Sequence, residues 1–424
     1  MSQSSETGDS RAAGSSFFDV RMRGFRDRAD VDDVLELLSR RVRPLPPETI
    51  RLDEAFGRVL AQDIVSDVAV PSFDRAAMDG YALHAEETFG AGSYNPFDFA
   101  IIGESLPGWP FSEGVRTGEA VRIMTGAPIP KGADSVLQAE AAEEVAGRLR
   151  IREAVSPGRN VGHKGEDIDV GAVILRANRL LRPQDLGVLA SIGQGRVAVF
   201  RRPTVSIVIT GDELLPCGSR PEGFRIVDSN SVMLAALTCR DGALPPSVQM
   251  VPDSRATIEA AILEAETDVL LVSGGSSVGQ EDHAPRILAD HGELAVHGMA
   301  LRPASPAGVG FLCDRLVFLL PGNPVSCLCA YDFFAGPTIR RLGGRSMDWP
   351  YQKRRLPLAR KIVSAVGRVD YVRVQIVGEK VEPLATSGAS ILSSTTRADG
   401  FVLVARDNEG CAAGEEVQVF LYDG

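Results

Sequence analysis

The sequence contains few lysines and no long apolar run. Only five of its 424 residues are lysine, so arginine carries most of the positive charge, and the formal net charge at pH 7 is −11. No basic stripe is present, which argues against general nucleic-acid binding. No run of about eighteen apolar residues exists, and no apolar core follows a basic N-terminal region. We therefore expect a cytoplasmic protein that binds neither nucleic acid nor membrane.

The six cysteines lack the spacings typical of metal or disulfide chemistry. The sequence has no CxxC pair, and a chain of 424 residues is too long for the class of small disulfide scaffolds. Cys327 and Cys329 follow a Gly-Asn-Pro turn, and we expect them to pack within a helix. No Ser-His-Asp or Cys-His arrangement is found, so the sequence indicates no covalent nucleophile.

The length predicts two to four domains. Residues 1–16 are rich in Ser, Gly and Ala, which predicts a disordered tail. Within 17–45, Asp30 is placed to cap a helix whose apolar residues recur at helical spacing and which packs on the α/β domain. A second short helix is predicted over 53–65.

Residues 69–168 have short apolar runs, many Gly and Pro residues and no long helical period. This pattern predicts a β-rich domain inserted between two halves of a linker domain, 46–68 and 169–199. Its loops carry Asp74, Asp79, Glu166 and Asp167. Most loop carboxylates are only solvated, but loops on a rigid scaffold also carry binding groups.

From residue 200 to 350 the sequence alternates short apolar runs with helical patterns. Strands are predicted at 204–209, 248–251, 269–272 and 316–320. This alternation predicts an α/β domain with a doubly wound parallel sheet. Residues 351–424 instead predict a small C-terminal β domain, resembling a barrel, with strands at 371–377, 400–404 and 416–421.

Four predicted strands and connections lead into polar or glycine-rich loops, at 210–213, 228–230, 273–282 and 322–326. Because parallel strands share a direction, these loops gather at one crevice at the carboxyl edge of the sheet. Helix N-termini after them suit a phosphate or another oxyanion, although a structural turn explains any single loop equally well. The candidate ligand-binding residues there are Thr210, Gly211, Asp212, Glu213, Ser229, Asn230, Ser273, Gly274, Gly275, Ser276, Ser277, Gly279, Pro321, Gly322, Asn323, Pro324 and Ser326.

Four carboxylates near this crevice could hold Mg²⁺, which takes oxygen ligands and bridges to substrate phosphates. They are Asp212, Glu213, Asp228 and Asp282. For Asp228, the cap of the following helix is an equal alternative. The polar loop at 387–394, with Arg397 and Asp399, is the C-terminal segment expected to reach the crevice.

Seven segments in order along the chain resemble the successive motifs of the molybdopterin molybdenumtransferases, the MoeA family. They are Phe73-Asp-Arg-Ala-Ala-Met-Asp-Gly-Tyr-Ala82, Arg122-Ile-Met-Thr-Gly-Ala-Pro128, Gly165-Glu-Asp-Ile168, Thr210-Gly-Asp-Glu-Leu214, Asp228-Ser-Asn230, Gly274-Gly-Ser-Ser-Val-Gly279 with Asp282, and Pro321-Gly-Asn-Pro-Val-Ser326. One such motif is weak, but seven in order over nearly the whole chain are specific.

The resemblance implies a Mg²⁺-dependent enzyme that takes adenylylated molybdopterin and molybdate and releases molybdenum cofactor and AMP. It implies an elongated homodimer of four-domain subunits, with the cleft between the α/β domain of one subunit and the inserted β domain of the other. It also implies a molybdopterin adenylyltransferase and molybdoenzyme apoproteins, or their chaperones, as partners. Asp228, Asp282, Asp79 and Asp167 would be catalytic, and further substrate contacts would come from Thr125, Glu166, Arg302, Arg368 and Ser394.

The chain departs from the family pattern at three positions where the family usually carries lysine: Pro285, Arg302 and Ser305. Arginine is not a free replacement for lysine at a phosphate, and the other two residues are neutral. His283, Arg286 or Arg302 could offset the loss. With these changes two alternative functions stay open. The protein could be a non-catalytic paralogue that acts as a cofactor carrier or scaffold, or an enzyme that prefers tungstate. An enzyme built on a related α/β domain alone is disfavoured by the matching motifs in the β domains.

Overall fold

The computed structural model describes residues 28–274, 283–385 and 388–422, and the chain divides into two compact units. One unit comprises Met1–Glu48 with Phe200–Gly424, and the other comprises Thr49–Val199. The predicted tail at 1–16 lies outside the described residues. The finer division into four domains stays a prediction.

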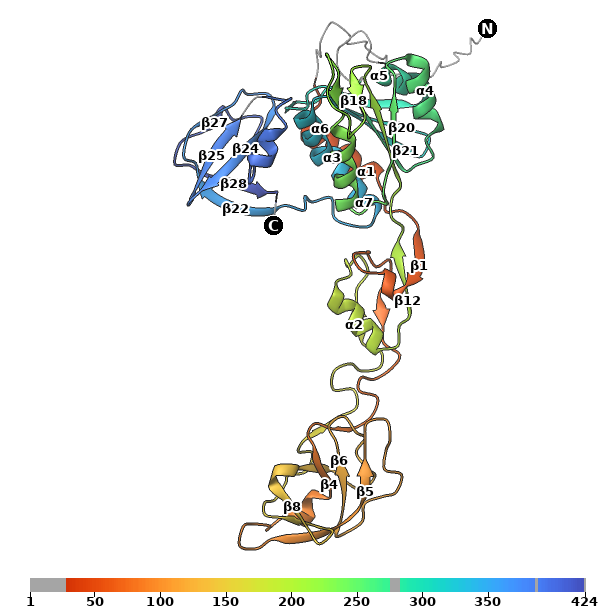
Figure 1. Ribbon diagram of the computed structural model, residues 1–424, viewed down its shortest axis with the longest axis vertical. Coiled ribbons are helices and arrows are strands. Elements are labelled where there is room, and N and C mark those ends of the chain that lie inside the picture. Colours follow the sequence, from red (N-terminus) through yellow and green to blue (C-terminus); the bar gives the residue numbers. More distant parts are fainter. Residues whose placement is uncertain (1–27, 275–282, 386–387, 423–424) are drawn as a thin grey trace, which may run out of the picture. The chain divides into compact units, whose positions relative to one another are not determined.

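The first unit is built on a six-stranded sheet. In spatial order the strands are β16 (Ser247–Val251), β13 (Val205–Thr210), β17 (Val269–Ser273), β21 (Arg315–Leu320), β20 (Gly308–Leu312) and β18 (Glu293–His297). The first four run parallel, as predicted, while β20 and β18 add an antiparallel edge (Figure 1). The sheet is therefore mixed.

Helices cover both faces of this sheet. Alternate residues of β13 show the two faces, since Ile207 and Ile209 pack in one core cluster and Val208 in another. The first cluster includes residues of α1 (Val31–Arg41), α3 (Asn230–Arg240), α6 (Pro324–Ala330) and α7 (Gly336–Leu342). The second includes residues of α4 (Arg255–Glu264) and α5 (Ala284–His291), which Figure 1 shows apart from the other helices. The doubly wound arrangement is confirmed.

One of the two predicted N-terminal helices forms. Asp30 caps α1 by accepting a hydrogen bond from the Asp32 N–H (3.1 Å), as predicted. The helix predicted over 53–65 is wrong, since only a 3-10 turn, η1 (Leu52–Glu54), is present, followed later by strand β2 (Ile64–Val65). Gly57 adopts a left-handed φ of +70°, and its N–H donates to Leu181 O rather than to a helical partner.

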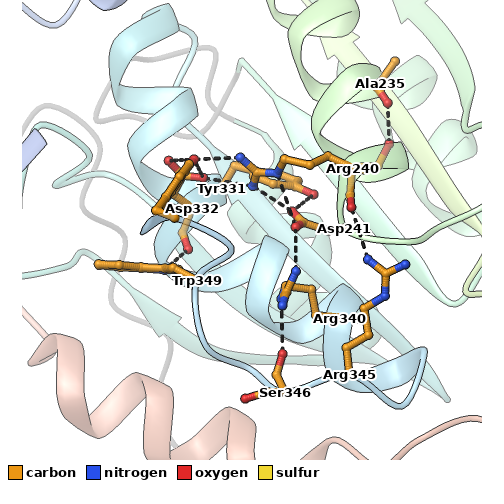
Figure 2. Close-up of polar contacts among 11 residues, drawn as sticks. Ala235, Arg240, Asp241, Tyr331, Asp332, Arg340, Arg345, Ser346 and Trp349 are labelled. Carbon is orange, nitrogen blue, oxygen red and sulfur yellow. Dashed lines mark hydrogen bonds and ion pairs between the residues drawn. The ribbon is translucent and has the colours of Figure 1, made fainter. Parts of the chain in front are cut away.

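A buried charged network joins α3 to the segment that leads into the C-terminal strands (Figure 2). Between α6 and α7 lies a π-helix, η4 (Tyr331–Ala335), which carries Asp332. Arg240 pairs with Asp241 (2.9 Å) and with Asp332 (3.3 Å), and Tyr331 donates to Asp241 (2.9 Å). Trp349 donates from its indole to Asp332 O (2.7 Å). We call Asp241 and Asp332, together with the arginines that pair with them, the buried aspartate pair.

The C-terminal residues form a second sheet. Its order is β19 (Leu301–Arg302), β24 (Val369–Val377), β26 (Gly400–Val404), β28 (Glu416–Leu421) and β22 (Gln352–Pro357), and β25 (Lys380–Ala385) pairs with β24. The three predicted strands are confirmed. The predicted polar loop includes the start of a short helix, α8 (Ser393–Arg397). Strand β19 extends this sheet with a segment from the α/β region.

The second unit is mainly β, as predicted for the inserted region. Its largest sheet contains β7 (Ser135–Gln138), β4 (Gly80–Leu83), β6 (Glu119–Ile123), β5 (Phe97–Ser105), β9 (Arg148–Ile151) and β8 (Ala142–Val145) in that order. Short pairs join β3 (Arg75–Ala76) to β10 (Val161–Gly162), β2 to β11 (Val173–Leu175), and β1 (Pro47–Arg51) to β12 (Arg196–Phe200). One α-helix, α2 (Pro183–Ser191), was not expected.

The protein is thus a multidomain α/β protein with a doubly wound sheet and two β-rich regions. No helix in the described ranges is long and apolar enough to cross a membrane.

Candidate active site

The carboxyl ends of β13, β17 and β21 surround a cavity of about 570 Å³, which we call the sheet-edge pocket. Of the predicted residues, it is lined by Thr210, Glu213, Asp228, Ser229, Asn230, Ser273, Gly274, Gly322, Asn323 and Pro324. The predicted convergence of strand-end loops is therefore confirmed for the described residues.

Two residues hold these loops together. Gly274 has φ +96°, and a Cβ atom there would lie 2.3 Å from Thr210 O, so only glycine fits between the strand ends. The Asn230 side chain donates to Ser273 Oγ (3.0 Å) and Gly322 O (2.8 Å). Asn230 Oδ1 is buried and makes no hydrogen bond with any described residue. Such an atom is a natural contact for a ligand or a water molecule.

Asp228 caps a helix and also lines the pocket. Its Oδ1 accepts from the N–H groups of Asn230 (2.9 Å) and Ser231 (3.2 Å) at the start of α3, so it acts as a helix cap. It also lines the sheet-edge pocket. These two N–H groups were expected to be open to an anion and are already occupied by Asp228.

The sheet-edge pocket is acidic. Glu213, Asp228 and Asp253 line it, and no lysine or arginine is among its lining residues in the described chain. Asp253, which accepts from Thr210 Oγ1 (2.6 Å), was not predicted. An anionic ligand would need a bound cation here to offset the carboxylates.

The donor set fits Mg²⁺, because it consists of carboxylate, hydroxyl and amide oxygens. Within the described ranges, no three His, Cys, Asp or Glu residues come together as a metal cage. A site without such a cage is compatible with Mg²⁺, because Mg²⁺ usually keeps several waters and binds through one or two carboxylates plus substrate phosphates. Asp212 does not line the pocket and accepts from Asp253 N–H (3.2 Å), while Asp282 lies outside the described residues.

The cysteines of α6 pack in the core, as expected. Cys327 and Cys329 are buried, and Cys327 Sγ lies 3.8 Å from Ser273 Oγ. Burial raises the pKa of the Cys327 thiol to about 12, which fits a packing role.

A second cavity of about 360 Å³, which we call the arginine pocket, lies beside the first. Four arginines line it: Arg28, Arg302, Arg368 and Arg373. Pro321, Ser326 and Ser305 also line it, and no Asp or Glu is among its lining residues in the described chain. Arg28 and Arg373 were not predicted.

Asp370 holds two of these arginines. Strand β19 pairs with β24 so that Arg302 lies opposite Asp370. The buried Oδ2 of Asp370 accepts from the Arg302 guanidinium and from Ser364 Oγ (2.6 Å), and Oδ1 lies 3.3 Å from Arg368 Nε. One carboxylate therefore orients two guanidinium groups at the wall of a cavity that contains four.

The two pockets meet at Asn323, which lines both. Ser390 lines the sheet-edge pocket and donates to Asn323 Oδ1 (2.9 Å). Gly388 and Ala389 line the arginine pocket, so the described part of the predicted C-terminal loop does reach the crevice.

Buried side-chain nitrogen and oxygen atoms that make no hydrogen bond among the described residues gather at these pockets. They include Asn230 Oδ1 in the first pocket and Arg302 Nε in the second. Arg368 Nε and Asp370 Oδ1 also lack a hydrogen bond, but they form an ion pair 3.3 Å apart. Unsatisfied buried groups are rare and point to a missing ligand, water or ion.

The predicted residues of the second unit make separate contacts. Asp79 Oδ1 accepts from Thr125 N–H and Thr125 Oγ1, both at 2.7 Å, and these bonds lower the pKa of Asp79 below its usual value. Glu166 pairs with Arg75 (3.3 Å) and accepts from His163 N–H (3.1 Å). Asp167 is exposed.

Several predicted residues do not line either pocket. Gly211 is buried beside Glu213 and Leu214, and Ser394 is buried and donates to Ile391 O (2.5 Å). Arg286 pairs with Asp290 (2.9 Å), and neither it nor His283 lines a pocket. Gly275, Ser276, Ser277 and Gly279 lie outside the described residues.

Two arginines of the arginine pocket, Arg28 and Arg373, were not predicted from the sequence. Neither lies in a motif or a spacing that indicates a binding site.

The fold and pockets define a multidomain α/β protein whose sheet edge carries an acidic pocket beside an arginine-lined pocket. Three family models match the chain: "MoeA N-terminal region (domain I and II)" over residues 29–193, "Probable molybdopterin binding domain" over 206–341, and "MoeA C-terminal region (domain IV)" over 355–422. The chain belongs to the MoeA family.

Relatives match over nearly their whole length. A Methanocaldococcus jannaschii protein named for molybdopterin biosynthesis is 36% identical, with 87% of this chain and 90% of that protein covered. The Haemophilus influenzae protein named molybdopterin molybdenumtransferase is 32% identical, with coverage of 89% and 94%. The crystal structure of a molybdopterin biosynthesis MoeA protein from Pyrococcus horikosii is 32% identical, covers 94% of this chain and 100% of its own, and has a TM-score of 0.82.

Proposed function

We propose that this protein transfers molybdenum from molybdate to adenylylated molybdopterin, forming molybdenum cofactor and releasing AMP. Membership of the MoeA family makes it a transferase of molybdenum cofactor biosynthesis. The observation that carries the particular reaction is the pair of neighbouring pockets of opposite charge that share Asn323. A reaction between an oxyanion and a phosphoanhydride needs two such sites side by side.

In this proposal, molybdate binds in the arginine pocket. Molybdate is a tetrahedral dianion, and guanidinium groups present forked donors that suit oxyanions. Arg302 and Arg368 are oriented by Asp370, and Arg28 and Arg373 add further positive charge.

The phosphoanhydride of the adenylylated pterin binds in the sheet-edge pocket. Asp228, with Glu213 or Asp253, would hold Mg²⁺ there, and that ion would neutralise charge on the phosphates. Asn230 keeps the strand ends in place and offers its buried Oδ1. A molybdate oxygen from the adjoining pocket can attack the adenylate phosphorus and break its P–O bond to the pterin phosphate. That oxygen then leaves molybdenum with AMP as the pterin sulfurs bind the metal, so the protein needs no covalent nucleophile.

We further propose a cytoplasmic homodimer in which Asp79, Thr125, Glu166 and Asp167 also contact substrate. The support is the family resemblance together with the grouping of Asp79 and Thr125. A mass measurement in solution should give two chains. Asp79→Asn should lower turnover much more than it lowers the melting temperature, because Asn keeps an oxygen that can accept from Thr125.

Reconstitution with purified protein tests the proposed reaction. Adenylylated molybdopterin is incubated with molybdate, tungstate or neither, with and without Mg²⁺, and AMP and active cofactor are measured. We expect AMP release that requires both molybdate and Mg²⁺. Molybdate-independent AMP release, or no release from folded protein, would contradict the proposal. Release with tungstate alone would assign the alternative metal, and charging of an apo-molybdoenzyme without AMP release would indicate a carrier.

Asp228→Asn tests the sheet-edge pocket. The variant keeps the shape of the cap but removes a charge that faces the proposed Mg²⁺, so we expect turnover to fall by about 100-fold or more. Asp314→Asn is the matched control, because Asp314 is exposed in the turn that precedes β21, away from the carboxyl edge. Equal activity of the two variants would remove Asp228 from the site.

A further inference from the structure

Arg28 differs from the other arginines of the arginine pocket. Arg302 and Arg368 are held by Asp370. Arg28 lies outside every motif of the chain, is exposed, and has no hydrogen-bond or ion-pair partner among the residues that the structure describes. Its charge is therefore not offset from within the described chain.

The backbone around Arg28 is nevertheless fixed. Ala29 pairs with Met299 in a parallel bridge, donating from its N–H to Gly298 O (3.0 Å) and accepting from Ala300 N–H (2.8 Å). Asp30 caps α1 and pairs with Arg406. These contacts place residue 28 beside the segment that continues into Arg302. Holding the backbone in place reduces the entropy lost when the side chain binds a ligand.

The turn around Met299 contains an uncharged residue, Ser305, that lines the arginine pocket. Ser305 donates to Met299 O (3.3 Å), and Met299 N–H donates to Ser305 O (2.8 Å). Ser305 and Arg28 thus approach the pocket from the two sides of Met299, one neutral and one cationic. A charge lost on one side of this turn can be supplied from the other.

We propose that Arg28 is a substrate-binding residue that contacts the tetrahedral oxyanion in the arginine pocket. This inference rests on the proposed function, which supplies molybdate as the oxyanion. A charge-assisted hydrogen bond from an arginine with no other partner strengthens anion binding, and it does so without changing the reacting atoms. Arg28 therefore sets the affinity for molybdate rather than the rate of the chemical step.

The first test is steady-state kinetics with Arg28→Ala and Arg28→Lys. We expect Arg28→Ala to raise the KM for molybdate about tenfold with kcat nearly unchanged, as for loss of uniform binding. Arg28→Lys should recover part of the affinity. Arg40→Ala is the control, since Arg40 is an exposed residue of α1 that pairs with Glu36 and lines neither pocket. An unchanged KM in Arg28→Ala, or a fall confined to kcat, would overturn the inference.

The second test moves the charge within the pocket. Adding Ser305→Lys to Arg28→Ala should restore most of the lost affinity, because a cation then returns to the same cavity from the other side of Met299. If the KM stays high in the double variant, Arg28 contributes something other than charge and the inference is wrong.

Calorimetric titration with tungstate separates this inference from the proposed function. It needs no pterin substrate and no turnover. If wild-type protein releases no AMP, the proposed function fails, yet weaker tungstate binding by Arg28→Ala would still support a role in oxyanion binding. If wild-type protein is active and both proteins bind tungstate equally, only the inference about Arg28 fails.

Discussion

The unit that contains the α/β sheet has two clusters in which arginines surround buried aspartates, and they differ in how completely the charges are matched. In the buried aspartate pair, Asp241 and Asp332 share Arg240, and Arg340 lies 3.6 Å from Asp241 (Figure 2). At the arginine pocket, four arginines line the cavity, and Asp370 pairs with two of them, Arg302 and Arg368.

The two clusters also differ in how many of their buried polar atoms have hydrogen-bond partners. Tyr331 donates to Asp241 and Tyr351 to Asp332 (2.8 Å), and no buried side-chain polar atom of these residues lacks a partner in the described chain. At the arginine pocket, Arg302 Nε makes no hydrogen bond in the described chain, and Asp370 Oδ1 makes an ion pair with Arg368 but no hydrogen bond there. Matched buried charges fix a structure, whereas unmatched ones beside a cavity indicate a ligand. The first cluster therefore ties η4 to α3, and we propose that the second binds an anion.

The largest expected effect comes from removing the carboxylate of each cluster. Asp332→Ala and Asp370→Ala should each lower the free energy of unfolding by about 3–5 kcal/mol. The first removes the buried acceptor of Tyr351 and one of the two carboxylates of Arg240, and the second leaves Arg302 and Arg368 without their carboxylate. Added molybdate should recover part of the loss in Asp370→Ala only, since a bound oxyanion can replace the carboxylate there. Chemical denaturation with and without molybdate, at matched ionic strength, measures both effects.

Equal rescue of both variants by molybdate would break the comparison, since it would show a general salt effect. Absence of rescue in Asp370→Ala would show that the arginine pocket needs its own carboxylate before it can take an anion.

A smaller effect concerns pH and the buried aspartate pair. Burial raises the pKa of Asp332 from its ordinary value of 3.8 to about 6, with Arg240 opposing the shift. The folded state therefore binds this proton more tightly than the unfolded state. The stability that Asp332 contributes is fully present below about pH 4 and is lost as pH rises through 6, and lowering the pH from 7.5 to 5 should recover about 1.4 kcal/mol.

Asp332→Asn isolates this contribution from other titrating groups. As the pH falls from 7.5 to 5, the free energy of unfolding of the wild type should rise relative to that of Asp332→Asn. A pH-independent difference would mean that Asp332 stays ionised throughout and that Arg240 outweighs burial.

The smallest effect compares arginine with lysine in the two clusters. Arg302→Lys should raise the KM for molybdate about fivefold, roughly 1 kcal/mol, because lysine cannot both fork toward an oxyanion and hold Asp370. Arg340→Lys, in the buried aspartate pair, should leave this KM unchanged. A similar rise in both variants would indicate an indirect effect of stability on activity.

Much of the sheet could be predicted from the sequence, because buried parallel strands read as continuous apolar runs. The run from Val269 to Val272 ends in Ser273 and Gly274, and β17 ends at Ser273, as expected. The shared direction of β13, β17 and β21 then placed Thr210, Asn230, Ser273 and Gly322 around one pocket. The antiparallel strands β20 and β18 were missed because their residues carry no long apolar run.

The arginine pocket could not be predicted as a whole because its residues are far apart in sequence. Arg28, Arg302 and Arg373 come together only when β19 pairs with β24 and Ala29 pairs with Met299. No spacing of residues in the sequence indicates those contacts. Arg302 and Arg368 were expected only from the family resemblance, and the carboxylate that orients them, Asp370, sits in an ordinary strand pattern.

A crystal structure of the protein soaked in tungstate tests the account most directly. Tungsten scatters X-rays anomalously, so its position can be located without assumptions about the ligand. We predict an anomalous peak in the arginine pocket, within hydrogen-bonding reach of Arg28, Arg302 and Arg368. A peak in the sheet-edge pocket beside Asp228, or an empty arginine pocket at saturating tungstate, would contradict the division of the site into an oxyanion pocket and a cation-bound phosphate pocket.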